Sequence, residues 1–568
     1  LAAALVFAVI LPLYHQAVDV YSSIYLTINP QVQMDLNHAG DVVELTGTNR
    51  DGVLLLEGYD PIRVPGKKMV GVPYALVIHK FFPMANAFFR NLGFNVLLSP
   101  PTNEEIIRLA QQTAQAETCY PVKLLHGHMA WLAEQGVDYI FMPSVHTMKH
   151  ESSHVEHNYG CVYMQTAPRL AANALDLERR GITLLSPVFD LDFGQEAMAS
   201  AMLGVGKQLG IPKPRCLPAL LSGAKAVRRH TAAVEKQGQE LLASLRPDDK
   251  VLVLITRNYG LSDPVLNMGI PRLLLERGHK VITLSHLPAH DLDLSEDYPN
   301  LYWPFGQHIL SGAKLVAHHP NLYAVYLTNH GCGPDTMLSY LFRKKMGDKP
   351  YLQIEVDEHF SPVGVITRIE AFLQSLEGRP AQPLPAGFSL TSVVHRPTAV
   401  AAVPERTGGP LLVPDLPPFT AYLRAYCEAA WETETRTLRL DSTTLPLGRA
   451  ETSSKEYLPF PALLGGVLTA AEAESGPFQV LLPSTQGAEA DGQYPWGVET
   501  VLERQGLCRV KVIAPELETL PERCPEPDLL FRAFLVGDLL LCAPPEQRDA
   551  LAPAGVPGWA ELETLAAH

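Results

Sequence analysis

The chain has 568 residues, 47% of them hydrophobic, and carries 45 Lys and Arg against 60 Asp and Glu, a formal net charge of −15. This length allows three or four domains with large buried cores, and the acidic balance argues against a surface that binds nucleic acid or an anionic membrane. Eight cysteines are too sparse for a disulfide scaffold, so we expect reduced thiols and a cytoplasmic protein.

Residues 1–66 form an N-terminal flank to which the sequence assigns no role. They open with an apolar run that ends at Leu13 and contains Pro12. A membrane helix needs ~20 apolar residues and a signal peptide needs a basic lead, so we expect no membrane partner. We interpret the run as a buried element of a chain cut from something longer, and a truncated membrane or signal segment stays open as the alternative.

From residue 67, short runs rich in Val, Ile, Leu and Tyr alternate with helical patterns, which is typical of α/β proteins with parallel sheets. We predict a first α/β lobe with a helical extension over 67–247 and a second lobe over 248–378. Within the first lobe, Thr102 is expected to cap a helix. A mainly antiparallel sheet within residues 250–357 would contradict this prediction.

Prolines recur without periodicity over 379–418, which predicts a linker, and the α/β pattern returns over 419–568 as a third, truncated lobe. The predicted fold class is therefore α/β, with two or three doubly wound parallel-sheet lobes around a cleft.

The third lobe looks like a degenerate copy of the first. The aligned segments are 119–127 with 457–465, 141–144 with 481–484, and 160–165 with 488–493. In this alignment Tyr457 replaces Cys119 and Glu489 replaces Cys161, and neither replacement is a good soft ligand for iron. The alternative is chance similarity between two α/β units.

Three cysteines, Cys119, Cys161 and Cys332, precede predicted helix starts on loops, too far apart for a local zinc finger. A helix N-terminus favours the thiolate, and loops at the carboxyl ends of parallel strands converge. Three thiolates meeting there could hold an iron–sulfur cluster, whereas the alternative is three inert, buried cysteines. Cys508 and Cys542 fall in apolar patterns and are expected in the core.

Other polar residues flank these positions. His126, His128 and His330 are candidates for hydrogen bonds to cluster sulfurs or for protonating a substrate. Arg257 follows a predicted strand and could bind an anionic substrate or pair with Asp263 as a structural clamp. Four histidines over 146–157 have the spacing of one helix face, for which we favour a solvated or cavity-facing helix over a zinc site. Neither a GxGxxG nor a GxxxxGK[ST] pattern occurs, so no nucleotide site of those kinds is expected.

Five segments carry a resemblance to a known family: VGVPYALVIHKFFPMANAFFRNLGFNVLLSPPTNEE, ETCYPVKLLHGHMAWLAEQGVDYIFMPSV, NYGCVYMQTAP, DPVLNMGIP and YLTNHGCGPDTMLSYLFRKKMGDKPYLQIEVDEH. The chain resembles the acyl-CoA dehydratase activase-related family, the CoA-substrate-specific enzyme activases, which are akin to the 2-hydroxyacyl-CoA (2-hydroxyglutaryl-CoA) dehydratase subunits. The resemblance covers residues 65–376 well and 420–540 more weakly.

The resemblance implies a [4Fe-4S]-type cluster on Cys119, Cys161 and Cys332, fed with low-potential electrons by an actin-like ATPase activator. ATP would enter only through that partner or a missing domain. The implied function is radical reductive chemistry on an acyl-CoA-like substrate in an anaerobic setting, by a dehydratase-type lyase or a component of an ATP-coupled reductase. The alternative is a non-catalytic electron-transfer or scaffold module that docks the ATPase, and a homo- or pseudo-dimer stays open.

Overall fold

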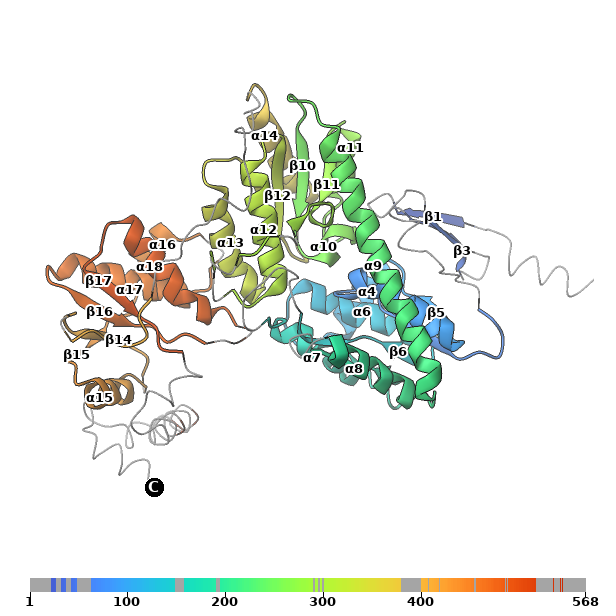
Figure 1. Cartoon of the computed structure of the whole chain (residues 1–568), viewed down its shortest axis with the longest axis horizontal. Coiled ribbons are helices and arrows are strands. Elements are labelled where there is room, and N and C mark those ends of the chain that lie inside the picture. The colour runs from blue at the N-terminus through green and yellow to red at the C-terminus, as the bar shows by residue number, and fades with distance from the viewer. Residues whose placement is uncertain are drawn as a thin grey trace, which may run out of the picture. The chain divides into compact units, whose positions relative to one another are not determined.

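The computed structural model describes residues 63–516 apart from 149–157, 191–194, 380–399 and scattered positions at 290–300, 407, 418, 454–455, 486 and 488. It also describes three strands within residues 22–47 and positions 535, 542 and 544. The chain divides into two compact units. The first unit holds the N-terminal strands and the first and second lobes, and the second unit holds the third lobe together with segments 295–302 and 333–341 (Figure 1).

The N-terminal flank contains a small antiparallel sheet that the sequence did not predict. Its strands are β1 (Ser22–Leu26), β2 (Val32–Leu36) and β3 (Val42–Gly47), paired in that order. Each strand pairs with its neighbour in the chain, so this sheet is a meander, unlike the crossover sheets that follow.

The first lobe is a four-stranded parallel sheet in the order β5-β4-β6-β8. Its strands are β4 (Met69–Val72), β5 (Asn95–Leu98), β6 (Tyr139–Phe141) and β8 (Thr183–Leu185). Its helices are α4 (Ile78–Leu92), α5 (Glu104–Thr113), α6 (Tyr120–Glu134) and α7 (Val162–Ala174). Beyond the sheet edge, β7 (Ser144–Thr147) and β9 (Val188–Asp190) pair in parallel.

The predicted helical extension is α8 (Gln195–Gln208) followed by α9 (Lys213–Ala243), a long helix that packs on α4 (Figure 1). Two glycines let α9 approach backbone in both lobes of the first unit. A Cβ on Gly223 would lie 3.0 Å from the carbonyl oxygen of Met84, and one on Gly238 would lie 1.8 Å from that of His286. The helix therefore contacts the first lobe with one half and the second lobe with the other.

The second lobe repeats the same topology in the order β11-β10-β12-β13, with every pairing parallel. Its strands are β10 (Val251–Ile255), β11 (Lys280–Thr283), β12 (Leu322–Asn329) and β13 (Leu352–Val356). Its helices are α10 (Asn258–Ser262), α11 (Ile270–Glu276), α12 (Pro304–His318), α13 (Gly333–Met346) and α14 (Pro362–Leu376), with a 3₁₀ turn, η3, at Leu284–His286. The prediction of parallel α/β lobes is confirmed.

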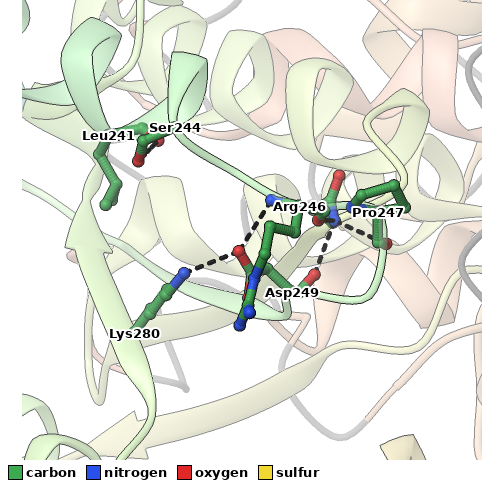
Figure 2. A network of polar contacts seen from close by, with 7 residues as sticks. Leu241, Ser244, Arg246, Pro247, Asp249 and Lys280 are labelled. Atoms are coloured by element: carbon green, nitrogen blue, oxygen red, sulfur yellow. Dashed lines mark hydrogen bonds and ion pairs between the residues drawn. The ribbon is translucent and has the colours of Figure 1, made fainter.

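A polar network ties α9 to the first strand of the second lobe (Figure 2). The carboxylate of Asp249 accepts hydrogen bonds from Lys280 Nζ at 2.7 Å and from the backbone N–H of Arg246 at 2.8 Å. The contact with Lys280 and the Arg246 N–H hold the pKa of Asp249 well below its usual range. The amide nitrogen of Asn321, which precedes β12, donates to the carbonyl oxygens of Arg246, Pro247 and Asp249. These contacts fix the loop that enters β10.

The third lobe has the strand order β15-β14-β16-β17, again all parallel and identical in sequence order to the first two. Its strands are β14 (Leu411–Pro414), β15 (Thr435–Leu438), β16 (Phe478–Leu481) and β17 (Val510–Ile513). Its helices are α15 (Phe419–Trp431), α16 (Leu445–Glu451), α17 (Pro459–Ala473) and α18 (Tyr494–Arg504), with a 3₁₀ turn, η6, at Asp491–Gln493.

Three expectations need correction. The predicted linker over 379–418 extends too far, because β14 is the buried first strand of the third lobe and begins at Leu411. His146 lies in strand β7, so the prediction that it shares one helix face with three other histidines is wrong. Those three histidines lie outside the described residues. Cys508 and Cys542 are exposed rather than in the core, while Cys427 is buried.

Candidate functional site

All three predicted ligand cysteines are the N-cap residues of helices. Cys119 precedes α6, Cys161 precedes α7 and Cys332 precedes α13, each with extended backbone angles and partial exposure. Because the first turn of a helix presents N–H groups without intrahelical partners, a thiolate at this position is favoured. The expectation that each cysteine starts a helix is confirmed.

Local sequence explains why the helices begin at these residues. Pro121 and Pro334 are each the second residue of their helix, α6 and α13, where their fixed φ suits a helix start. Gly331 adopts φ +67° and turns the chain after β12, and the N–H of Cys332 returns to the carbonyl of Asn329 at 3.3 Å. The tight turn expected beside Cys332 is therefore present.

The turn before Cys161 depends on a glycine in close contact with β7. The N–H of Gly160 donates to the carbonyl of His146 at 2.7 Å, and a Cβ on Gly160 would lie 2.6 Å from the carbonyl oxygen of Val145. The side-chain amide of Gln165 donates to the carbonyl of Gly160 at 3.0 Å, which pins the first turn of α7 to this loop.

Arg257 contacts one of the three cysteines. Its Nη2 lies 3.1 Å from Sγ of Cys332, and its guanidinium carbon lies 4.3 Å from the centre of the Phe305 ring. Arg257 is only 8% exposed and is the N-cap of α10. A permanently charged donor is therefore held against the Cys332 sulfur, partly shielded from water.

The alternative reading of Arg257 as a clamp on Asp263 is wrong. The buried carboxylate of Asp263 accepts a short hydrogen bond from the hydroxyl of Thr102, and two more from the N–H groups of Val265 and Leu266 at 2.9 and 3.0 Å. Burial raises the pKa of Asp263 in spite of these donors. Asp263 thus connects the loop after α10 to the first lobe rather than to Arg257.

His128 is the centre of this buried connection. Its Nδ1 lies 2.8 Å from the hydroxyl of Ser99 and its Nε2 lies 3.1 Å from that of Thr102, which also binds Asp263. Burial, with the neighbouring His79, lowers the pKa of His128 to about 3. With both ring nitrogens in hydrogen bonds within the first lobe, His128 is placed to orient Thr102, which bonds Asp263 of the second lobe, rather than to reach a substrate. Thr102 belongs to this connection, and the N-cap of α5 is instead Asn103.

The other predicted histidines lie in different surroundings. His126 is buried, and burial lowers its pKa. Its Nδ1 has no hydrogen-bond partner among the described residues. His330 is exposed, with Nδ1 3.2 Å from Oε1 of Glu355. Of the three, only His330 is open to a molecule in solvent.

Sequence reasoning missed Lys123, one turn after Cys119 in α6. Its Nζ lies 2.7 Å from Glu117 and 2.8 Å from Glu358 of the second lobe, although the residue is buried. Burial alone would lower the pKa of Lys123, but hydrogen bonds to both carboxylates raise it. A lysine in an otherwise apolar stretch, YPVKLLHGHMAWL, was the available signal.

The donor set fits an iron–sulfur cluster in its chemistry: three thiols at helix N-termini, one of them beside a guanidinium. In the part of the chain that the structure describes, no group of three His, Cys, Asp or Glu residues is arranged to hold a single metal ion. The meeting of Cys119, Cys161 and Cys332 at one cluster therefore stays a prediction.

The fold and the cysteine caps define a class: an α/β protein of doubly wound parallel-sheet lobes whose partly exposed cysteines begin helices. Residues 69–287 match the model of the CoA enzyme activase uncharacterised domain. This match supports a CoA enzyme activase-related family for that part of the chain, as the resemblance indicated. Residues 21–71, which include the antiparallel sheet, match the model of the anti-sigma factor RsgI-like central domain.

Other comparisons add little. A search of curated proteins finds no match to this chain. Among solved structures, the FpvC protein of P. aeruginosa with bound Ni²⁺ is 12% identical, with 54% of this chain and 98% of that chain covered and a TM-score of 0.19. A putative phosphosugar isomerase from Clostridium difficile 630 is 11% identical, with 59% and 91% covered and a TM-score of 0.17. Scores of this size carry no argument. None of the helices in the described residues is long and apolar enough to cross a membrane.

Proposed function

We propose that this chain is an iron–sulfur protein of the CoA enzyme activase type, in which Cys119, Cys161 and Cys332 hold a [4Fe-4S]-type cluster. The observation that carries the proposal is that all three cysteines are helix N-caps on a chain with an activase-related domain. Such a cluster, when bound, accepts and donates single electrons at low potential. Three protein thiolates would leave one iron open to an outside ligand.

The residues around these caps have separate roles in the proposal. Arg257 places a positive charge at the Cys332 sulfur, whereas Lys123, one turn into α6 after Cys119, is paired with Glu117 and Glu358. Thr102, which also bonds His128, and Asp263 hold the lobes of the first unit together, while His330 is exposed and able to exchange a proton with a bound molecule. The substrate would be an acyl-CoA-like molecule, and ATP-driven electrons would come from an actin-like ATPase partner.

A second candidate is an electron-transfer or scaffold module without catalysis of its own. The burial of His126 and His128 favours it, because two of the three predicted proton donors cannot reach a solvent-borne substrate in this conformation. In this case the cluster would exchange electrons with another protein only.

Anaerobic reconstitution with ferrous iron and sulfide tests the proposal. We expect about four iron and four sulfide per chain, lost in Cys119→Ala, Cys161→Ala and Cys332→Ala. Cys508→Ala is the matched control, since this cysteine is exposed in the third lobe. Iron retained in all three variants, or lost equally in the control, would contradict the assignment.

The two candidate functions separate in a second measurement. The cluster is reduced with dithionite, and its reoxidation is followed after adding a 2-hydroxyacyl-CoA. Reoxidation with loss of water from the substrate supports the enzyme. A cluster that stays reduced, and is reoxidised only by a protein acceptor, supports the module.

A further inference from the structure

The contact between Arg257 and Cys332 places a positive charge on a sulfur that the proposed function makes a cluster ligand. The donor nitrogen lies 3.1 Å from Sγ, and the guanidinium is stacked on the Phe305 ring and 8% exposed. Arginine stays charged at any pH at which the protein is folded. Because the guanidinium is buried while Cys332 is partly exposed, the interaction is screened less than a contact between two surface residues.

The short helix α10 holds Arg257 in this position. At its C-terminal end, the hydroxyl of Ser262 lies 2.6 Å from Nδ1 of His79, and the next residue, Asp263, is bound by Thr102. Within it, a Cβ on Gly260 would lie 2.8 Å from the Thr256 side chain, so the first turn packs tightly on the end of β10. The first lobe therefore fixes the helix that carries the arginine.

We propose that Arg257 is a positioning residue that raises the reduction potential of the cluster by donating a charged hydrogen bond to the Cys332 sulfur. This inference rests on the proposed function. Reduction adds one electron, taken from a low-potential one-electron donor, and no bond forms or breaks. The added negative charge is stabilised by the fixed positive charge, as hydrogen bonds to ligand sulfurs raise the potential of such centres.

The test is a potentiometric titration of the reconstituted full chain, followed by the loss of visible absorbance on reduction. The variant Arg257→Gln keeps an amide donor and removes the charge. We expect its midpoint to move to more negative potential by ~59 mV or more, which is a tenfold change in the ratio of oxidised to reduced protein. Arg246→Gln removes an exposed arginine at the other end of β10 and should leave the midpoint unchanged.

A second variant keeps the inference testable if Arg257→Gln does not hold the cluster. Phe305→Leu keeps the charge but removes the ring on which the guanidinium rests, and should give a smaller shift in the same direction. A wild-type midpoint in every variant that holds the cluster would overturn the inference while leaving the proposed function intact. A wild-type chain that takes up no iron and sulfide would instead overturn the proposed function, and the inference with it.

Discussion

The packing of α6 on α5 leads to a quantitative prediction at Gly127. A Cβ at this position would lie 2.1 Å from the carbonyl oxygen of Ile106 and 3.0 Å from the backbone nitrogen of Ala110. Both atoms belong to the backbone of α5, so no side-chain rotation can relieve the contact. In Gly127→Ala, the two helices must move apart.

Two opposing contributions decide how much Gly127→Ala changes the free energy of unfolding. Alanine in place of glycine inside a helix gains ~1 kcal/mol of stability, whereas overpacking a closed contact costs ~1–3 kcal/mol and sometimes more. A contact of 2.1 Å with backbone lies at the severe end, so the cost should win and the first lobe should lose about 1–2 kcal/mol. Because Cys119 caps α6, the displacement should also reduce iron uptake.

The matched control is Gly204→Ala in α8, where a Cβ would meet nothing within 4 Å. This variant should be more stable than wild type by up to ~1 kcal/mol. Urea unfolding followed by circular dichroism, with hydrogen exchange of α5 and α6, measures both. If Gly127→Ala were as stable as Gly204→Ala and protected α5 and α6 equally, the close packing of these helices would be refuted.

Three further predictions follow from buried contacts. Gly465→Ala should destabilise the third lobe as Gly127→Ala does the first, because its Cβ would lie 2.3 Å from the carbonyl oxygen of Thr444. The rate of proteolysis of the folded chain measures this loss of stability. Gly476→Ala is the control, because a Cβ there would meet nothing within 4 Å. Thr102→Val should cost ~1–3 kcal/mol because it removes the hydroxyl that bonds Oδ2 of Asp263 and Nε2 of His128, whereas Thr166→Val, at an exposed site, should change the urea midpoint little. Burial lowers the pKa of His79 and His128 to about 3. The unfolded chain therefore binds their protons first as the pH falls below ~6.5, and each histidine should cost ~1.4 kcal/mol of stability at pH 5.5. Asp263 has the opposite effect on stability. Because its pKa is raised in the folded state, the unfolded chain releases that proton at lower pH, and stability falls as the pH rises. The urea midpoint should therefore fall less between pH 7.5 and 5.5 in His128→Gln than in wild type. An equal fall in both would contradict the lowered pKa of His128.

The fold was predictable where local pattern and burial agree. The lobe predicted over 248–378 contains β12 (Leu322–Asn329) and α14 (Pro362–Leu376) as strand and helix of a parallel α/β unit, because apolar runs flanked by turn residues leave few alternatives. The antiparallel sheet of the N-terminal flank was not predicted. β14 was assigned to the linker because Pro410 and Pro414 flank its apolar residues, and recurring prolines indicated a linker.

The site was predictable only in part, for a physical reason. Helix N-caps follow from local sequence, so the surroundings of Cys119, Cys161 and Cys332 were visible in advance. Contacts between lobes depend on long-range packing, which one sequence does not reveal. A pair of Arg257 with Asp263 was thus one of two alternatives that the sequence left open, whereas each residue contacts another far away in the sequence.

Comparison of the first and third lobes shows which features the scaffold requires. After β6, the N–H of Ser144 donates to the carbonyl of Pro187; after β16, Ser484 donates to Pro515, both at 3.0 Å. Each lobe also has a glycine, Gly127 or Gly465, at a close crossing of two helices. These backbone contacts do not involve the residues at the helix starts, so the cysteines could be replaced without loss of the fold.

Within the second unit, the two residues that the alignment places opposite Cys119 and Cys161 lie close to the first residue of α13. At the first residue of α13, a Cβ on Gly333 would lie 3.6 Å from the Tyr457 ring and hydroxyl and 3.8 Å from Oε2 of Glu489. Burial, with Asp491, Tyr457 and Glu489 nearby, raises the pKa of Tyr494 to about 12. A carboxylate beside a helix N-terminus is stabilised by the exposed N–H groups, as a thiolate would be. Glu489 therefore lies close to the first residue of α13, where a carboxylate is favoured for the same electrostatic reason as a thiolate at a helix start.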